Sequence, residues 1–392
     1  MRALLAFLVL ALTAASGDIQ EQLKAQGYTV YTATVGPFSS NWDRACELYA
    51  QIKGGQVDYG VAHSKAHGHS RFGRTFPGLY PQWGQVGANG KVNKVHLFGH
   101  SMGGQTIRML TQLLNKGAKG APVVEPATTH PLFAGGKDWV HSITTLSTPN
   151  QGTLLANGFS EVGDAVKTLI GGVFAVLGVS GDVTASVYDA KLDQWGIGPK
   201  QSSETIGQYI NRVFASRLFQ PGFKDISLWS LSTNGAKEES TWIETLPNVY
   251  YYSYSNEDTF AARDENDGVV NTVSMAKDSV GKSRTFDGTT VIGQWNRMPL
   301  LNSMDHLAVI GVTLHTQIKD FYAAHAKLLA GLPAGTSRSS SGSSLVTEAA
   351  ASSTKTKADL QALCNAKASD KNAQRYCQTM LNQPNTSRSL RG

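Results

Sequence analysis

A serine held between two glycines, where a strand turns into a helix, constrains this sequence more than any other feature. In "KVNKVHLFGHSMGGQTIRMLTQLL" the apolar run Val95–Phe98 is typical of a buried strand, and apolar residues recur at helical spacing after the serine. Gly99 and Gly103 flank Ser101 in the pattern G-x-S-x-G. Only glycine lets the backbone crowd so closely, and the sharp turn holds the serine hydroxyl clear of the sheet. The stretch predicts a nucleophile elbow rather than an ordinary Gly/Ser turn, because the strand and the helix supply the context that the pattern needs.

Segments with strand and helix patterns alternate along the chain. Helical spacing and capping residues predict helices in "DIQEQLKAQG", in "SNWDRACELYAQI" and from about Gln317 to Leu329. Runs rich in β-branched and aromatic residues predict strands in "YTVYTATVG", "VHSITTLSTPNQG" and "NVYYYSYS". This alternation is typical of a doubly wound α/β fold with a mostly parallel sheet.

The composition divides the chain into four parts. Residues 1–16 combine one Arg, an apolar run and a small-residue end, which predicts a secretory signal peptide rather than a membrane span. Residues 17–332 are globular in composition, and the apolar, glycine-rich stretch from about 154 to 180 is interpreted either as a core helix or as a helical lid over the serine. Residues 333–357 read as a Ser/Thr-rich linker, and residues 358–392 as a short basic tail.

The net charge gives no sign of a polyanionic partner. The formal charge is +6, but the residues from Pro333 onward hold eight Lys/Arg against three Asp/Glu, so the preceding body is nearly neutral. This distribution argues against nucleic-acid binding. Among the cysteines, Cys46 is expected to be a buried apolar residue in a helix, whereas Cys364 and Cys377 in the tail could pair with each other in a secreted chain.

A nucleophilic serine needs a general base, and the base needs a carboxylate that orients it. In α/β-hydrolases these partners follow the serine in the order Asp/Glu, then His. Asp267 lies in a turn in "ENDGVVNTVSMA", and His306 lies in "NSMDHLAVIG". Asp264 is the nearest rival to Asp267, and Asp305 is a poorer orienter because adjacent side chains rarely face each other. The order and the loop positions favour Ser101, Asp267 and His306 as a catalytic triad.

Three histidines are concentrated in "DYGVAHSKAHGHSRFGRTFPGL". His63, His67 and His69 fall within seven positions, and such a cluster is compatible with a zinc site built from His, Asp or Cys ligands. A polar surface loop is the competing interpretation, and the spacing alone does not decide between the two.

At these residues the sequence resembles the thermoalkalophilic bacillus and staphylococcal triacylglycerol lipases. The resemblance covers most of residues 17 to about 329, and it implies an α/β-hydrolase fold in which Ser101 is the nucleophile, Asp267 the orienting acid and His306 the base. It also implies a structural zinc ion on an extra loop near the lid, with Asp43, His63, His69 and Asp193 as ligands and His67 outside the coordination sphere. The matching runs are "VGPFSSNWDRACELYAQIKGGQVDYGVAHSKAHGHSRFGRTFPGL", "GHSMGGQTIRML", "TTLSTPNQGT", "KLDQWG", "ENDGVVNTVSM" and "DHLAVIG".

The sequence departs from that family in three places. The family begins its fold with an apolar strand and a His-Gly-Phe turn that supplies one oxyanion N–H; this strand is expected to be missing here, leaving the N–H of Met102 as the remaining donor. The positions that match the family's calcium ligands are Ala308 and Thr313, which offer no carboxylate, so no calcium is expected there. The insertion before the acid is shortened to "NEDTFAARDE", which leaves the preferred acyl length open.

These features together predict a secreted, monomeric lipase that hydrolyses carboxylic esters of glycerol at a lipid/water interface. Two alternatives remain open at this point. One is an esterase of short soluble acyl chains. The other is a zinc-folded lipid-binding protein without catalysis, which the expected loss of one oxyanion donor would explain.

Overall fold

The chain folds around one parallel sheet in the computed structural model, which describes residues 4–8, 18–153, 156, 189–220, 222–257, 267, 269–270, 272–276, 281–311 and 317–333. The sheet has seven strands in the order β2-β1-β5-β6-β7-β10-β9, and every pairing in it is parallel. The prediction of a mostly parallel sheet is therefore confirmed. The strands are β1 (Leu4–Leu8), β2 (Thr29–Thr32), β5 (Val95–His100), β6 (Val140–Leu146), β7 (Tyr250–Tyr254), β9 (Ser283–Thr285) and β10 (Trp295–Arg297).

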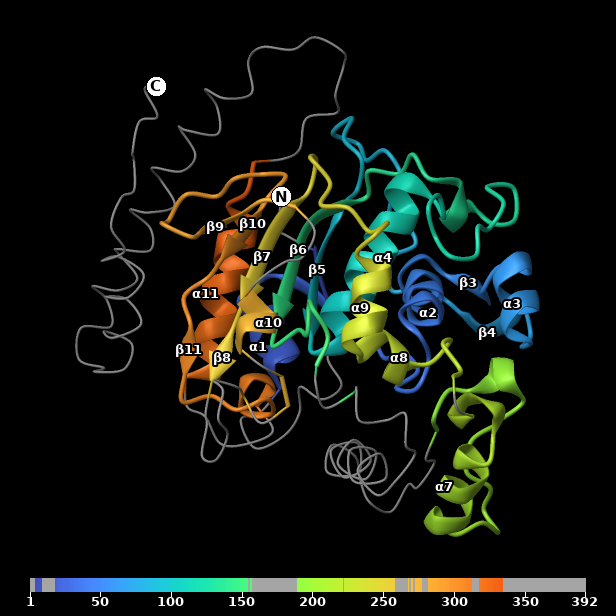
Figure 1. Cartoon of the computed structure of the whole chain (residues 1–392). Coiled ribbons are helices and arrows are strands. Elements are labelled where there is room, and N and C mark those ends of the chain that lie inside the picture. The colour runs from blue at the N-terminus through green and yellow to red at the C-terminus, as the bar shows by residue number, and fades with distance from the viewer. Residues whose placement is uncertain are drawn as a thin grey trace, which may run out of the picture.

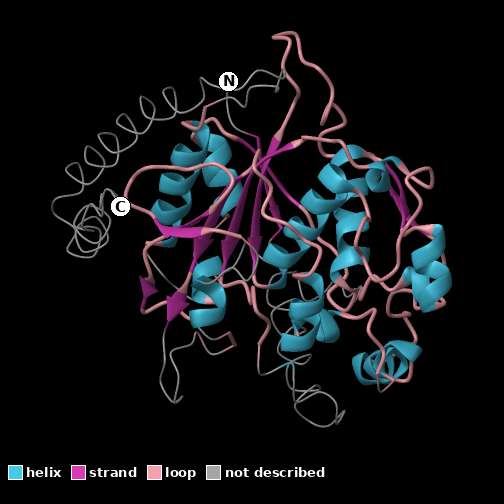
Figure 2. Ribbon diagram, turned by 45° about the horizontal axis from the view of Figure 1, so that its top comes forward, coloured by secondary structure: helices cyan, strands magenta, loops and turns pink. Residues whose placement is uncertain are grey.

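Helices cover both faces of the sheet (Figure 1). Helices α1 (Ile19–Ala25) and α11 (Ile318–Ala330) pack on one face, and α2 (Asn41–Lys53), α4 (Met102–Lys116) and α9 (Thr233–Glu239) lie on the other. The side chains of β7 alternate accordingly: Tyr251 belongs to the core under α2 and α4, whereas Tyr252 belongs to the core under α11. Strands buried on both faces account for the apolar runs in the sequence. Figure 2 shows the strands as a layer between the two groups of helices.

The local patterns that predicted helices and strands are confirmed in detail. Helix α2 begins where Ser40 accepts a hydrogen bond from the backbone N–H of Asp43, and α1 begins in the same way at Asp18. Cys46 lies in α2 and is buried with a free thiol, as expected. Within the described ranges, no helix is both long and apolar enough to cross a bilayer.

The first residues of the chain depart from expectation. The family's first strand was expected to be missing, yet Leu4–Leu8 form β1, which pairs in parallel with β2 on one side and with β5 on the other. The physical reason is that an apolar run of this kind meets the needs of a buried parallel strand as well as those of a signal peptide. The strand beside the elbow strand is therefore present, although residues 9–17, where the His-Gly-Phe turn would follow it, lie outside the described part.

An extra substructure projects from the α2 side of the sheet (Figure 1). Its core is an antiparallel pair formed by β3 (Gly55–Asp58) and β4 (Phe72–Phe76), which the sequence patterns did not predict. Helix α3 (Val61–His67) lies between these two strands in the sequence and carries His63 and His67, and His69 follows it. The remaining elements are α7 (Ile206–Phe214), α8 (Ser227–Leu231), β8 (Asn256–Glu257), α10 (Thr272–Ala276) and β11 (Leu301–Asn302), and the short 3-10 helices η1 (Pro131–Ala134), η3 (Asp193–Trp195), η4 (Arg217–Phe219) and η5 (Ala308–Ile310).

Candidate active site and metal site

Ser101 occupies a strained turn between β5 and α4. Its backbone has φ 53° and ψ −132°, a conformation that L residues rarely adopt and that costs about 1–3 kcal/mol. Two glycines of the turn are required by close packing: a Cβ on Gly99 would lie 2.4 Å from the carbonyl carbon of Gly103, and a Cβ on Gly104, the residue after the motif, would lie 2.1 Å from Oγ1 of Thr148. The turn is thus the sharp elbow that the sequence predicts.

The structure brings the three predicted triad residues together. His306 Nε2 lies 2.9 Å from Ser101 Oγ, and His306 Nδ1 lies 2.7 Å from Asp267 Oδ2. The backbone N–H of His306 also donates to the carbonyl of Asp267 at 3.0 Å, which fixes the two loops to each other. Ser101 follows β5, and the two partners follow strands further along the sheet, so all three lie at the carboxyl edge, where open α/β sheets carry their sites.

Asp267 is held as an ionised acceptor. Burial by itself would raise the pKa of its carboxyl, but the hydrogen bond and the charge of His306, with N–H donors from Val270 and Val269, lower that pKa below its usual value. These backbone N–H groups bind Oδ1 at 2.8 and 3.0 Å, which leaves Oδ2 to His306 and to Nδ2 of Asn256. The carboxylate is therefore aimed at the imidazole from behind.

His100, the residue before Ser101, contacts His306 through its ring. The two rings are tilted against each other with centroids 4.6 Å apart, and His100 Nε2 lies 2.9 Å from the carbonyl oxygen of His306. Burial, with the charge of His306, lowers the pKa of His100 to about 3. A neutral His100 donates to that carbonyl and adds no positive charge beside His306.

The rival acids differ in placement. Asp305 does not reach the His306 ring in any contact of the described residues; its Oδ1 accepts the backbone N–H groups of Leu307 and Ala308, both at 2.7 Å. Asp264 lies outside the described residues, as does the predicted lid at about 154–180, apart from Ala156. The N–H of Met102 opens α4 in its first turn, where a helix leaves its donors without intrahelical acceptors.

Four side chains from three segments form a buried cluster that could hold a metal ion. They are Asp43 on α2, His63 on α3, His69 just after α3, and Asp225 just before α8, and their ligand atoms all lie within 4.8 Å of one another. His63 Nε2 lies 3.2 Å from Asp43 Oδ1 and 3.3 Å from Asp225 Oδ1, and His69 Nε2 lies 3.3 Å from Asp225 Oδ2. Neighbouring ligand atoms around a tetrahedral zinc ion lie about 3.3 to 3.5 Å apart, so the spacing fits such an ion.

The hydrogen bonding of the cluster also fits a central cation. Oδ1 of Asp43, both carboxylate oxygens of Asp225 and Nε2 of both histidines are buried without a hydrogen-bond partner. Two carboxylates left in this state would cost several kcal/mol unless a cation compensates them. The donor set of two carboxylates and two imidazoles is one that zinc accepts.

The structure corrects one predicted ligand. Asp193, on η3, does not reach the cluster, because its Oδ2 accepts a hydrogen bond from Arg74 Nε at 2.7 Å. The acid that takes its place in the cluster is Asp225. The run "KLDQWG" contributes instead through the next residue: Gln194 Nε2 donates to Asp43 Oδ2 at 2.9 Å and so turns Oδ1 toward the histidines. The only signal for Asp225 was its place in "GFKDISLW", next to large apolar residues that favour burial and hence a compensating partner.

Other residues hold the histidines of the cluster in place. Glu125, which is buried, accepts the backbone N–H groups of Val61, Ala62 and His63 at 2.8, 2.8 and 3.0 Å and thereby caps α3. The ring of Trp42 stacks on that of His63 with centroids 4.9 Å apart and an interplanar angle of 10°.

His67, which the resemblance leaves outside the coordination sphere, is not among the four residues of the cluster.

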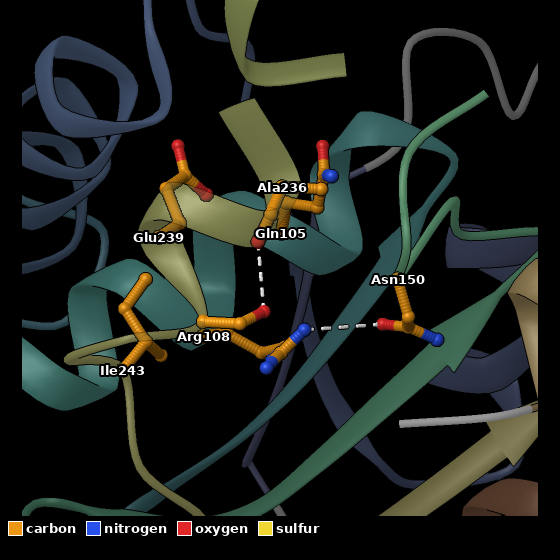
Figure 3. A pocket seen from close by; sticks show the side chains of 7 residues that line it. Gln105, Arg108, Asn150, Ala236, Glu239 and Ile243 are labelled. Carbon is orange, nitrogen blue, oxygen red and sulfur yellow. Dashed lines mark hydrogen bonds between the residues drawn. The ribbon is translucent and has the colours of Figure 1, made fainter. Parts of the chain in front are cut away.

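A small cavity lies beside α4 and is distinct from the triad. It is lined by Gln105, Arg108, Asn150, Ala236, Glu239, Ser240 and Ile243. Figure 3 shows these side chains between α4, α9 and the loop after β6, with Arg108 donating to Asn150. None of the triad residues lines it, so it is not the place where an ester would meet Ser101.

The chain is similar in sequence to known proteins. The family described as "Lipase-like, C-terminal domain" matches residues 13–264, more than half of the chain. Lipase 2 of Staphylococcus aureus strain MRSA252 is 36% identical over 331 residues, which cover 74% of this chain and 45% of that protein. The chain therefore spans about half the length of the curated relatives that it matches.

The chain is also similar to solved structures. The structure of lipase 1 from Pelosinus fermentans is 39% identical and covers 85% of this chain and 99% of that chain, with a TM-score of 0.74. The structure of EstA from Clostridium botulinum is 38% identical and covers 86% of this chain and 88% of that chain, with a TM-score of 0.72. The parallel sheet and these neighbours together give an α/β-hydrolase-like fold. The family match and the sequence identities show that the chain belongs to the lipase-like C-terminal domain family, which includes the staphylococcal lipases.

Proposed function

We propose that this protein is a triacylglycerol lipase that hydrolyses carboxylic esters of glycerol through Ser101, His306 and Asp267. The observation that carries the proposal is the placement of one imidazole between a serine hydroxyl and a buried carboxylate, at 2.9 and 2.7 Å. The names of the relatives, lipase 2 and lipase 1, support the choice of substrate class.

Each residue has one role in this reaction. His306 Nε2 takes the proton of Ser101 as Oγ attacks the ester carbonyl, and Asp267 stabilises the imidazolium that forms. The N–H of Met102 donates a hydrogen bond to the oxyanion. Met102 is the first residue of α4, so the positive end of the helix dipole also lies beside the oxyanion. His306 then gives its proton to the departing alcohol. Water, activated by the same imidazole, releases the fatty acid from Ser101.

The metal site has a structural role in this proposal. Zn²⁺ would be held by Asp43, His63, His69 and Asp225, and would supply a cross-link between α2, α3 and the segment before α8. None of the four ligands contacts Ser101, His306 or Asp267 in the interactions of the described residues, so the chemistry at the serine needs no ligand from the metal. No calcium is proposed at Ala308 and Thr313, because neither side chain offers a carboxylate.

The protein would act outside the cell, on a lipid/water interface, as a monomer. The signal-like composition of residues 1–16 supports export, but the same residues supply β1, and a cleaved segment cannot remain in the sheet. Determining the N-terminal residue of the secreted protein would separate the two roles.

The proposal is tested with emulsified triacylglycerols and a pH-stat, comparing the native chain with Ser101→Ala. The native chain should release fatty acid, with a rate that rises sharply once the substrate exceeds its solubility, and Ser101→Ala should lower the rate by at least about 10⁴-fold while its circular dichroism is unchanged. Activity confined to dissolved short-chain esters would favour the esterase alternative. Lipid binding without any hydrolysis would favour the binding-protein alternative.

A further inference from the structure

An asparagine behind the Asp267 carboxylate connects the loops of the active site. Asn256 is fully buried at the start of β8, with 0% of its surface exposed. Its Nδ2 donates to Asp267 Oδ2 at 3.2 Å and to the carbonyl of Met304 at 3.0 Å, and its Oδ1 accepts the hydroxyl of Ser147 at 2.6 Å. One amide therefore joins the end of β6 to the loops that carry Asp267 and His306.

The partners of Asn256 determine which way its amide points. A carboxylate oxygen of Asp267 and a backbone carbonyl can only accept, so the NH₂ end must face them. Oδ1 then faces Ser147, whose hydroxyl is left with the donor role. Ser147 holds this position at a cost, since its φ of 53° lies in the left-handed region that disfavours residues with a Cβ. Its own N–H donates to the carbonyl of Tyr254 at 3.2 Å.

Asn256 shares an acceptor atom with the catalytic imidazole. Asp267 Oδ2 accepts both His306 Nδ1 and Asn256 Nδ2, so the amide takes up part of the negative charge that the imidazolium would otherwise face. Among the described residues, the other titratable groups around His306 are His100, whose ring packs against it, and the adjacent Asp305, whose Oδ1 is occupied by two backbone N–H groups. Asn256 is thus a neutral donor aimed at the acid of the site.

We propose that Asn256, fixed by Ser147, is a positioning residue that aims the Asp267 carboxylate at His306 and limits how strongly that carboxylate holds a proton on the imidazole. This inference rests on the proposed function of Ser101, His306 and Asp267. It assigns a positioning role to two residues that act on the imidazole only through Asp267.

The test is the pH dependence of ester hydrolysis by Asn256→Ala. Without the amide donor, the negative charge on Asp267 Oδ2 is less compensated and stabilises the protonated imidazole of His306 more strongly. The acid limb of the pH profile, where kcat/KM falls as the pH decreases, should therefore move up by about half a pH unit. The Asp267 carboxylate would also be held less firmly in its orientation toward His306. This change should lower kcat about tenfold, the effect of losing roughly one hydrogen bond to a charged group. KM should stay the same, because Asn256 contacts no substrate.

Asn296→Ala is the matched control. Asn296, on β10, is equally buried, and its Nδ2 donates to the carbonyls of Tyr251 and Val291, both at 3.0 Å. Its removal should lower the free energy of unfolding by an amount similar to that for Asn256→Ala, but should leave the acid limb in place. If the acid limb of the pH profile shifted by the same amount in both variants, the proposal would be overturned, because lost stability would then account for the shift.

Ser147→Ala and Ser147→Gly keep the test decisive if Asn256→Ala does not fold. Both remove the hydroxyl that orients Asn256, but only glycine relieves the positive φ, so Ser147→Gly should be the more stable of the two. Both should move the acid limb upward by the same amount, less than Asn256→Ala does. An unchanged acid limb in the Ser147 variants, or in Asn256→Ala with unchanged kcat, would refute the positioning role. A native chain without Ser101-dependent hydrolysis would instead refute the proposed function itself.

Discussion

Replacing Asp225 by asparagine should remove the metal ion, whereas the same change at Asp193 should not. Asp225 is 2% exposed, and both of its carboxylate oxygens lack any other partner. Asp193 is about one-third exposed and pairs with Arg74. Asparagine keeps the shape of each side chain but removes the charge that a divalent cation needs, so the two variants form a matched pair.

The expected sizes follow from linkage. An ion present at about 1,000 times its dissociation constant stabilises the folded state by about 4 kcal/mol, and each kcal/mol corresponds to roughly 2–4 °C in a domain of this size class. Asp225→Asn should therefore melt on the order of 10 °C below the native chain. Asp193→Asn loses only a partly exposed ion pair, worth up to about 1 kcal/mol, and should melt within about 4 °C of it.

The assay combines metal analysis by mass spectrometry with thermal denaturation in the presence and absence of a chelator. The native chain and Asp193→Asn should carry one zinc ion per chain and lose stability to the chelator, whereas Asp225→Asn should carry none and be insensitive to it. An Asp193→Asn variant without zinc beside an Asp225→Asn variant that retains it would refute the ligand assignment. Full occupancy in both variants would show that neither side chain binds the ion.

Three further predictions test the fold around the site. Gly104→Ala should lower the free energy of unfolding by about 1–3 kcal/mol in urea, because its Cβ would lie 2.1 Å from Thr148 Oγ1; an unchanged midpoint would show that this contact relaxes freely. Burial lowers the pKa of His325 to about 3, below its unfolded value near 6.5, so its stabilising effect is complete above pH 6.5 and is lost as the pH falls toward 3. His325→Gln should therefore flatten the loss of stability between about pH 6 and 4 by roughly 1.4 kcal/mol per pH unit, and equal slopes for both chains would contradict a neutral, buried histidine. Ala6→Pro should prevent folding as judged by circular dichroism, since Ala6 pairs with both neighbours of β1, and normal folding would show that β1 is dispensable.

The features that the sequence predicted well are local ones. The elbow at Ser101 requires its glycines within a few residues, and the start of α2 requires only Ser40 and the N–H three residues later. The order of Asp267 and His306 after Ser101 predicted the other two members of the triad, because loops that follow parallel strands meet at one edge of a sheet.

The features that the sequence missed depend on contacts between distant segments. Asp193 and Asp225 are both acids outside the histidine loop, and only the folded chain shows that Arg74 engages the first while both histidines face the second. Asn256 gave no signal in the sequence, because its partners come from three separate loops.

The start of the chain was misjudged for a different reason. The apolar composition of residues 4–8 suits an exported signal and a buried strand equally, so the sequence did not predict β1, which only its pairing with β2 and β5 shows.

Labelling with a fluorophosphonate, followed by intact-mass and peptide analysis, would show whether Ser101 is an activated nucleophile. An activated serine attacks the phosphorus, and the adduct remains on the nucleophile. The account predicts one adduct per chain, located on Ser101, absent from Ser101→Ala and formed much more slowly in His306→Ala. A chain that hydrolyses esters but carries no adduct on Ser101, or an adduct that persists in Ser101→Ala, would contradict it.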